Sequence, residues 1–348
     1  MDVSLHCREY PVDATNHFLV YNFWQQDKSV PGMKHFAVSL TLILLGQLAL
    51  ANQNPGPGQG FIDVPGGPVW YKIVGTGSGI PVIALHGGPG GTSCGYSLLE
   101  PLGDQRPVIR YDQLGTGRSG RPSDLSLWRT ERFVEALDMV LEALGAEQYH
   151  LLGHSWGGAL AGAYVAEKGT GRLASITFSS PLLSTPMWIA DANLLRKRLP
   201  TDVQATLTRH EDAGTTDSEE YEAASDLFYE RHVRYGEPAE ESDDCSDAPW
   251  NPVIYNYMWG PTEFRATGNL SDFDVTGSLG GIDVPVLYIT GEFDEARPQT
   301  VARFREMTPG AQLVVIKGVA HASLSRAPDT YRKTIEKFFD WVEGMAKE

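Results

Sequence analysis

The sequence is short of positive charge, of cysteine and of long apolar runs. Its 348 residues carry 28 Lys and Arg against 44 Asp and Glu, which gives a formal net charge of −16. An acidic surface argues against nucleic acid and anionic membranes as partners, because both are bound through Lys and Arg. No internal repeat is visible, so a solenoid is excluded as the architecture. The length allows one large domain with an insertion, or two domains.

Cysteine occurs only as Cys7, Cys94 and Cys245. Their spacing matches no metal site, and the sequence predicts neither a metal ion nor a cofactor. Cys94 and Cys245 could pair in an oxidising compartment, but two free thiols is the simpler expectation.

The longest uncharged apolar run covers residues 36–50, which is short for a membrane span. It follows Met33 and a lysine and ends at Ala-Leu-Ala, the pattern of a cleaved secretory signal. We therefore expect a signal peptide over 33–51, with Met33 as the true start and 1–32 as a mis-assigned extension. The mature protein is then secreted or periplasmic, without stable membrane association. A buried helix or uncleaved anchor is the alternative, and an unused signal would leave the protein cytoplasmic.

Short β-branched runs alternate with helical patterns along the rest of the chain. Apolar residues at helical spacing predict helices over 133–144 and 331–342. The alternation predicts an α/β fold with a mainly parallel sheet that helices cover on both faces. Residues 61–75 predict an antiparallel hairpin at the sheet edge. The runs expected to form buried strands are 81–87, 107–115, 149–155, 173–181, 285–294 and 312–321.

The alternation breaks between about residues 182 and 282. This stretch is polar, helical in pattern and rich in acidic residues. We interpret 182–282 as an inserted helical cap. The α/β core then consists of 52–181 and 283–348.

The motif GHSWGG, residues 153–158, follows a predicted strand and opens a helical run. G-x-S-x-G in a strand–turn–helix context is the nucleophile elbow of hydrolases. Gly153 and Gly157 keep side chains away from the tight turn, so that the Ser155 hydroxyl is exposed above the sheet. Ser155 is therefore the candidate nucleophile.

A serine hydroxyl needs a base to become a strong nucleophile, and in this context the chain order is Ser, then acid, then His. Asp294 and His321 follow the strands at 285–294 and 312–321, at the carboxyl edge where Ser155 also lies. His321 is the candidate base and Asp294 the acid that orients it. Glu292 and Glu295 remain rivals for the acid.

The stretch ALHGGPGG, residues 84–91, is a glycine turn after another predicted strand. Glycine permits positive φ and close approach to the main chain. In a nucleophile elbow, one oxyanion donor is the N–H of the residue after the serine, here Trp156. The second donor is expected from the turn, as Gly88 N–H with Gly87 as the alternative. His86 is expected to anchor this turn rather than act as a base.

Together, HGGPGG, DQLGTGRS, GHSWGG, YNYMWGPTEF, GEFDEARP and the late GVAH resemble the proline iminopeptidase family of α/β-hydrolases. The similarity runs from about residue 60 to the C-terminus. It implies an α/β-hydrolase fold in which a helical cap covers a Ser–Asp–His triad. It also implies an aminopeptidase that releases N-terminal residues, often proline, from small peptides.

The resemblance gives roles to two more carboxylates. Glu263 in GPTEF and Glu295 beside Asp294 match family glutamates that bind the α-amino group of the substrate. A buried ammonium needs such partners. Tyr255 and Trp259, from the same cap motif, are expected to line this pocket, although packing alone is the alternative for both.

Two other functions remain open at this stage. A hydrolase of the same fold could act on esters, lactones or amides that lack an N-terminal amine. A non-catalytic binding protein on this scaffold is the more remote alternative, because Ser155, Asp294 and His321 are all present.

Overall fold

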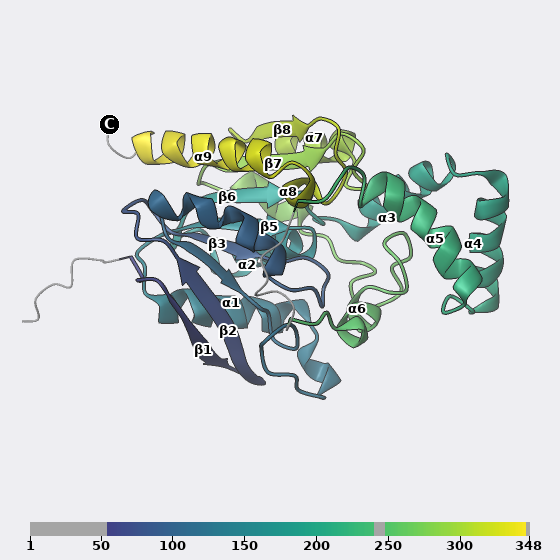
Figure 1. Cartoon of the computed structure of the whole chain (residues 1–348), viewed down its shortest axis with the longest axis horizontal. Coiled ribbons are helices and arrows are strands. Elements are labelled where there is room, and N and C mark those ends of the chain that lie inside the picture. Colours follow the sequence, from purple (N-terminus) through teal and green to yellow (C-terminus); the bar gives the residue numbers. More distant parts are fainter. Residues whose placement is uncertain (1–53, 240–247, 346–348) are drawn as a thin grey trace, which may run out of the picture. The chain divides into compact units, whose positions relative to one another are not determined.

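An eight-stranded sheet runs through the part of the chain that the computed structural model describes, residues 54–239 and 248–345 (Figure 1). Its strand order is β1-β2-β4-β3-β5-β6-β7-β8. The signal peptide and the extension predicted before residue 52 lie outside the described residues. The strands are β1 (Gly58–Val64), β2 (Gly67–Val74), β3 (Val82–Leu85), β4 (Val108–Tyr111), β5 (Tyr149–His154), β6 (Leu173–Ser179), β7 (Val286–Gly291) and β8 (Gln312–Ile316).

The sheet is parallel from β4 to β8, and an antiparallel hairpin of β1 and β2 extends it beside β4. This confirms the predicted α/β class and the edge hairpin. Strands β3 to β7 are buried along their whole length except at His154, the last residue of β5, as continuous apolar runs require. Strand β8 was predicted to be buried and is not: it is the other edge strand, and its Val315 is 39% exposed.

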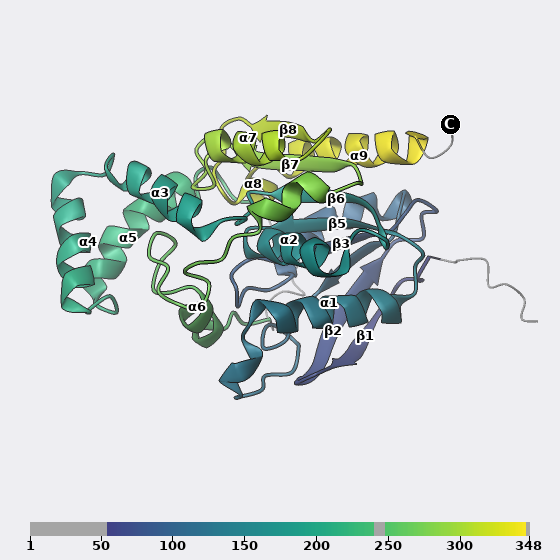
Figure 2. The ribbon, with the colours of Figure 1, turned by 180° about the vertical axis from the view of Figure 1, so that it is seen from behind.

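Helices cover both faces of the sheet. One face carries α1 (Thr130–Leu144), α2 (Trp156–Lys168) and α7 (Pro298–Met307), which Figure 2 shows in front. The opposite face carries the 3₁₀ helix η1 (Cys94–Asp104), α8 (Ser323–Arg326) and α9 (Pro328–Met345). The two predicted helices correspond to α1 and α9. Short 3₁₀ turns occur at η2 (Leu125–Leu127) and η4 (Thr276–Gly281).

Between β6 and β7, the described residues form four further α-helices, beside the carboxyl ends of the strands (Figure 1). They are α3 (Thr185–Arg196), α4 (Thr201–Ala213), α5 (Glu219–His232) and α6 (Pro252–Met258). Leu207, Phe228 and Phe264 belong to a small apolar core among α3, α4 and α5. The cap boundaries at 182 and 282 stay a prediction.

Helix α6 packs onto the loops of the core. Asn251, its N-cap, donates its backbone N–H to Gly90 O at 2.8 Å and its side-chain amide to Gly115 O at 2.8 Å. A Cβ at Gly90 would lie 2.5 Å from Asn251 O. Glycine is therefore required there for the cap to reach the core.

Cys94 is disulfide-bonded, and its partner lies outside the described residues. The expectation of two free thiols is therefore wrong. Within the described ranges, every helix is too short or too polar to span a bilayer.

Candidate functional site

Ser155 stands at the turn between β5 and α2, at φ 55° and ψ −120°. A non-glycine residue at positive φ is strained, and such strain is common at functional sites. The neighbouring glycines make the turn possible: a Cβ at Gly153 would lie 2.2 Å from Gly157 O, and one at Gly157 would lie 2.0 Å from Leu85 O. The strand–turn–helix context expected for GHSWGG is present.

His321 and Asp294 meet at the carboxyl edge of the sheet. His321 Nδ1 lies 2.9 Å from Asp294 Oδ1. Asp294 is 1% exposed and also accepts hydrogen bonds from the Ser180 hydroxyl at 2.6 Å and the Thr290 hydroxyl at 3.0 Å. Because the carboxylate accepts at Nδ1, the ring nitrogen Nε2 is free to accept a proton.

The rival acids are placed differently. Glu292 is exposed and accepts the backbone N–H of Gly318 at 3.0 Å. Glu295 lies on the other side of the imidazole, with Oε1 3.9 Å from His321 Nε2. The geometry therefore pairs Asp294, rather than either glutamate, with Nδ1.

The two partners stabilise each other in their charged forms. Burial alone would lower the pKa of His321, but the Asp294 carboxylate and, more weakly, Glu263 raise this pKa above its usual value. Burial alone would raise the pKa of Asp294, but His321 and the Ser180 hydroxyl bring it below its usual value. An imidazolium that forms at His321 is thus stabilised where it is needed.

The imidazole of His321 is held between two rings. His154 lies on one side, with a centroid separation of 4.5 Å, and Trp188 meets His321 edge-on at 5.5 Å. Burial and the nearby His321 lower the pKa of His154 to about 3, so His154 is neutral. The neutral ring of His154 thus lies against His321.

His86 anchors the glycine turn, as the sequence predicted. Its Nε2 accepts the backbone N–H of Gln113 at 3.0 Å, and its Nδ1 lies 2.9 Å from Gly87 O. Gln113 completes the link: its side chain donates to His86 O and accepts from the indole N–H of Trp156, both at 2.9 Å. The turn and the elbow are thereby fixed relative to each other.

Two backbone N–H groups at this junction are free. Gly88 N–H and Trp156 N–H have no hydrogen-bond acceptor in the described part of the chain. Gly87 packs on the elbow, where an added Cβ would lie 3.1 Å from Ser155 Cβ. Unpaired amides beside Ser155 form a site that can hold an oxyanion.

Two carboxylates face the same region. Glu295 is 1% exposed, and neither of its carboxylate oxygens has a hydrogen-bond partner among the described residues. Burial, then Glu263 and Asp294, raise its pKa well above the usual value. Burial also raises the pKa of Glu263, which accepts a hydrogen bond from Tyr255. Tyr229 accepts the backbone N–H of Glu263 at 3.3 Å. Such a group of unneutralised carboxylates favours a bound cation.

The sequence did not single out several residues of this site: Gln113, Ser180, Trp188 and His232. Ser180 directly follows β6 and Gln113 lies two residues after β4, so position at a carboxyl strand edge was the available signal. Trp188 and His232 are on cap helices, and no local pattern distinguishes them from packing or solvated residues. His232 is tied to the loop after β7, because its Nδ1 donates to Phe293 O at 2.9 Å.

Comparisons with known proteins agree with this geometry. A family model described as the alpha/beta hydrolase fold matches residues 80–328. A proline iminopeptidase of Heyndrickxia coagulans is 46% identical over 288 residues, which cover 82% of this chain and 99% of the relative. One from Lactobacillus acidophilus is 32% identical over 78% of this chain and 94% of its own length. The crystal structure of a proline iminopeptidase from Mycobacterium smegmatis superposes with a TM-score of 0.74 at 31% identity, covering 83% of this chain and 100% of that one.

Proposed function

Because the chain belongs to the proline iminopeptidase family of α/β-hydrolases and is a serine hydrolase of the aminopeptidase class, we propose that it releases N-terminal residues, preferably proline, from small peptides. The observation that carries this proposal is a pair of carboxylates, half-buried Glu263 and buried Glu295, near His321. Because these carboxylates can pair with an ammonium group, we expect the site to require a substrate with a free N-terminal amine.

In the first half of the reaction, Ser155 Oγ attacks the scissile carbonyl carbon while His321 Nε2 takes the hydroxyl proton. The carbonyl oxygen becomes an oxyanion, which accepts hydrogen bonds from Gly88 N–H and Trp156 N–H. His321 then gives its proton to the leaving nitrogen, and the C–N bond breaks. The products of this half are an acyl-enzyme ester on Ser155 and a shortened peptide.

In the second half, water replaces the leaving peptide. His321 takes a proton from the water, whose oxygen attacks the ester carbonyl through the same oxyanion. The Ser155 oxygen leaves with the proton from His321, and the free amino acid departs. Throughout, Asp294 keeps Nδ1 protonated and Nε2 directed at the reacting atoms.

The amine is bound through charge. A protonated N-terminal proline carries two N–H donors, and Glu263 and Glu295 offer one carboxylate to each. Glu295 has no hydrogen-bond partner of its own in the described chain, so a bound ammonium supplies the one it lacks. This binding energy also fixes the scissile carbonyl over Ser155, so it supports kcat as well as KM.

Replacement of Glu263 tests the proposal. Glu263→Gln should reduce kcat/KM for prolyl arylamides by roughly 3–5 kcal/mol in transition-state stabilisation, the usual cost of breaking a buried pair. N-acetylated ester substrates should be affected far less. Glu230→Gln, an exposed carboxylate on α5, is the matched control. An equal loss on free-amine and N-acetylated substrates would favour a general esterase or amidase instead.

We further propose that the segment 33–51 directs export of the protein. Its apolar run and small-x-small site support this, and so does the disulfide at Cys94, since disulfides persist mainly in oxidising compartments. N-terminal sequencing of the protein from the medium or periplasm tests the proposal. A chain recovered solely from the cytoplasm, with residues 33–51 intact, would contradict it.

A further inference from the structure

A pocket of about 180 Å³ adjoins the segments that carry the catalytic residues. Three of its lining residues are direct neighbours of the site: Gly87 in the glycine turn, His154 before Ser155 and Ala322 after His321. Gly95 from η1 and Leu324 from α8 line the pocket as well. The pocket therefore adjoins the segments that carry the nucleophile, the base and the oxyanion turn, and Ser155 and His321 themselves lie just outside its lining.

The surroundings of His321 are not chemically uniform. Trp188 and Glu295 lie near the ring and line a separate small cavity, whereas His154 packs against the ring and lines the pocket. None of the described cap residues lines the pocket, and neither does Glu295. The carboxylates proposed to hold the substrate amine thus lie outside the pocket.

We propose that this pocket is the subsite for the first residue on the leaving side of the scissile bond, and that it favours an uncharged aliphatic or aromatic side chain. The proposal rests on the aminopeptidase function above. With the amine of the acyl residue held by Glu263 and Glu295, the leaving chain must extend from the carbonyl carbon in another direction. Its nitrogen must remain near His321 to receive a proton, which brings the next side chain to the pocket.

The lining explains the preference for an uncharged side chain. Two of its hydroxyl groups already donate to backbone carbonyls: the Tyr96 hydroxyl donates to Leu85 O at 2.8 Å, and the Ser325 hydroxyl donates to Ala322 O at 3.1 Å. His154 is neutral, and no Asp, Glu, Lys or Arg lines the pocket among the described residues. A charged side chain would lose its hydration there without gaining a partner. The volume equals the share of roughly six liquid water molecules, which is enough for one mid-sized side chain.

Gly95 offers a direct test, because a Cβ added there meets no atom within 4 Å. The Gly95→Leu variant should fill the pocket. Prolyl-phenylalanine and prolyl-glycine form the same acyl-enzyme, so a difference between them arises in acylation alone. We expect kcat/KM to fall at least about tenfold more for prolyl-phenylalanine than for prolyl-glycine, the scale at which apolar pockets discriminate. Gly277→Leu, in the 3₁₀ helix η4 with the same open space, is the control and should leave the ratio unchanged.

A second variant covers the case in which Gly95→Leu does not fold. Leu324→Trp fills the pocket from α8 and should change the same ratio in the same direction. An unchanged ratio in both variants, or an equal loss on both dipeptides, would overturn the subsite while leaving the aminopeptidase function intact. If the unmodified protein cleaves neither dipeptide but hydrolyses N-acetylated esters, the proposed function itself fails.

Discussion

His321 is surrounded by three carboxylates, and each acts on it differently. Asp294 bonds Nδ1, Glu295 lies 3.9 Å from Nε2, and Glu263 raises the pKa of the ring from a greater distance. The proton that His321 must accept is therefore held more tightly than on an isolated imidazole. The pH dependence of the enzyme should report this directly.

We expect kcat/KM to fall as the pH drops through the raised pKa of His321, because the base must be neutral to accept the serine proton. The acid limb should lie above 6.5, the ordinary histidine value. Glu263→Gln removes one influence that raises the pKa and should move the limb to lower pH. A pH–rate profile on a neutral ester substrate measures the position of the acid limb and its shift in the variant. If the limb does not move in Glu263→Gln, Glu263 does not raise the pKa of His321.

Ser155 allows a test that separates catalysis from backbone strain. Ser155→Ala should remove nearly all activity, while the oxyanion donors and substrate binding still leave about 10³–10⁴ over the uncatalysed rate. At φ 55° and ψ −120°, glycine is less strained than alanine. Ser155→Gly should therefore be equally inactive but unfold at a higher temperature than Ser155→Ala in calorimetry. A lower melting temperature for Ser155→Gly than for Ser155→Ala would contradict the inference that the backbone is strained at this position.

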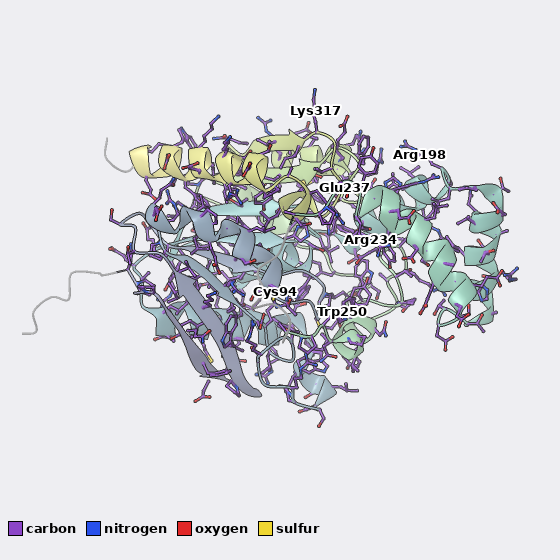
Figure 3. All side chains as sticks on the ribbon, viewed as in Figure 1. Cys94, Arg198, Arg234, Glu237, Trp250 and Lys317 are labelled. Atoms are coloured by element: carbon purple, nitrogen blue, oxygen red, sulfur yellow. The ribbon has the colours of Figure 1, made fainter. Side chains whose placement is uncertain are left out.

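At the scale of elements, the end of α5 forms hydrogen bonds with the loops that carry Glu295 and His321. The backbone carbonyl of His232 accepts the N–H groups of Glu295 and His321, both at 3.2 Å. Val233 O accepts Ala322 N–H at 3.0 Å, and Ala239 N–H donates to Ser325 O at 2.6 Å. We call these contacts of residues 232–239 the α5 clasp; Arg234 and Glu237 mark the segment in Figure 3. The clasp joins the loops after β7 and β8 to the cap.

The side chain of His232 closes the clasp through its bond to Phe293 O, which makes it a positioning residue. His232→Ala should lower kcat/KM about tenfold on free-amine and N-blocked substrates alike, because a small misplacement of a triad is costly. His232→Asn should recover most of the loss, since the asparagine amide can donate from nearly the same place. If Asn is no better than Ala, the hydrogen bond does not position the triad.

At the scale of the whole molecule, ion pairs and hydrogen bonds hold helix α9 at the amino ends of the strands, opposite the proposed active site. Arg106 is 2% exposed, forms ion pairs with Glu343 and Asp340, and stacks on Phe339. Glu343 also accepts Ile80 N–H and His150 Nε2, both at 3.2 Å. The C-terminal helix thus connects segments at the start of β3, β4 and β5.

Glu343→Gln should destabilise the fold by roughly 2–4 kcal/mol, because it leaves the buried Arg106 with a weaker partner while Glu343 itself is partly exposed. Asp340→Asn, at the exposed end of the same cluster, is the control and should cost about 1 kcal/mol or less. Urea unfolding measures both. An equal loss of stability in the two variants would show that burial does not make the Arg106–Glu343 pair stronger than the Arg106–Asp340 pair.

The same cluster predicts a pH dependence of stability. His150 and Arg106 lower the pKa of Glu343 from 4.5 to about 2, against the effect of burial. A lowered folded-state pKa stabilises the protein above the unfolded value, and the contribution is lost as the pH falls from 4.5 towards 2. Glu343→Gln should flatten this part of the profile. If Glu343→Gln loses stability just as steeply over this pH range, the loss is caused by other carboxylates.

The sequence alone predicted the positions of the strands, the elbow and the order of the proposed triad, because each depends on a short local pattern. A buried parallel strand requires a continuous apolar run, and a nucleophile elbow requires glycine beside Ser155. The family resemblance added Glu263 and Glu295, and the comparisons confirmed the family and the fold.

Tertiary structure decided what depends on distance between remote segments. It paired Asp294 rather than Glu292 with His321, made β8 an edge strand, and brought His232, Trp188 and Gln113 to the site. These side chains come from separate cap and core elements, and their spacing in the chain carries no signal of their contact. Burial and the distances between charges set the pKa values of His321, Glu295 and Glu343, and both exist only once the chain has folded.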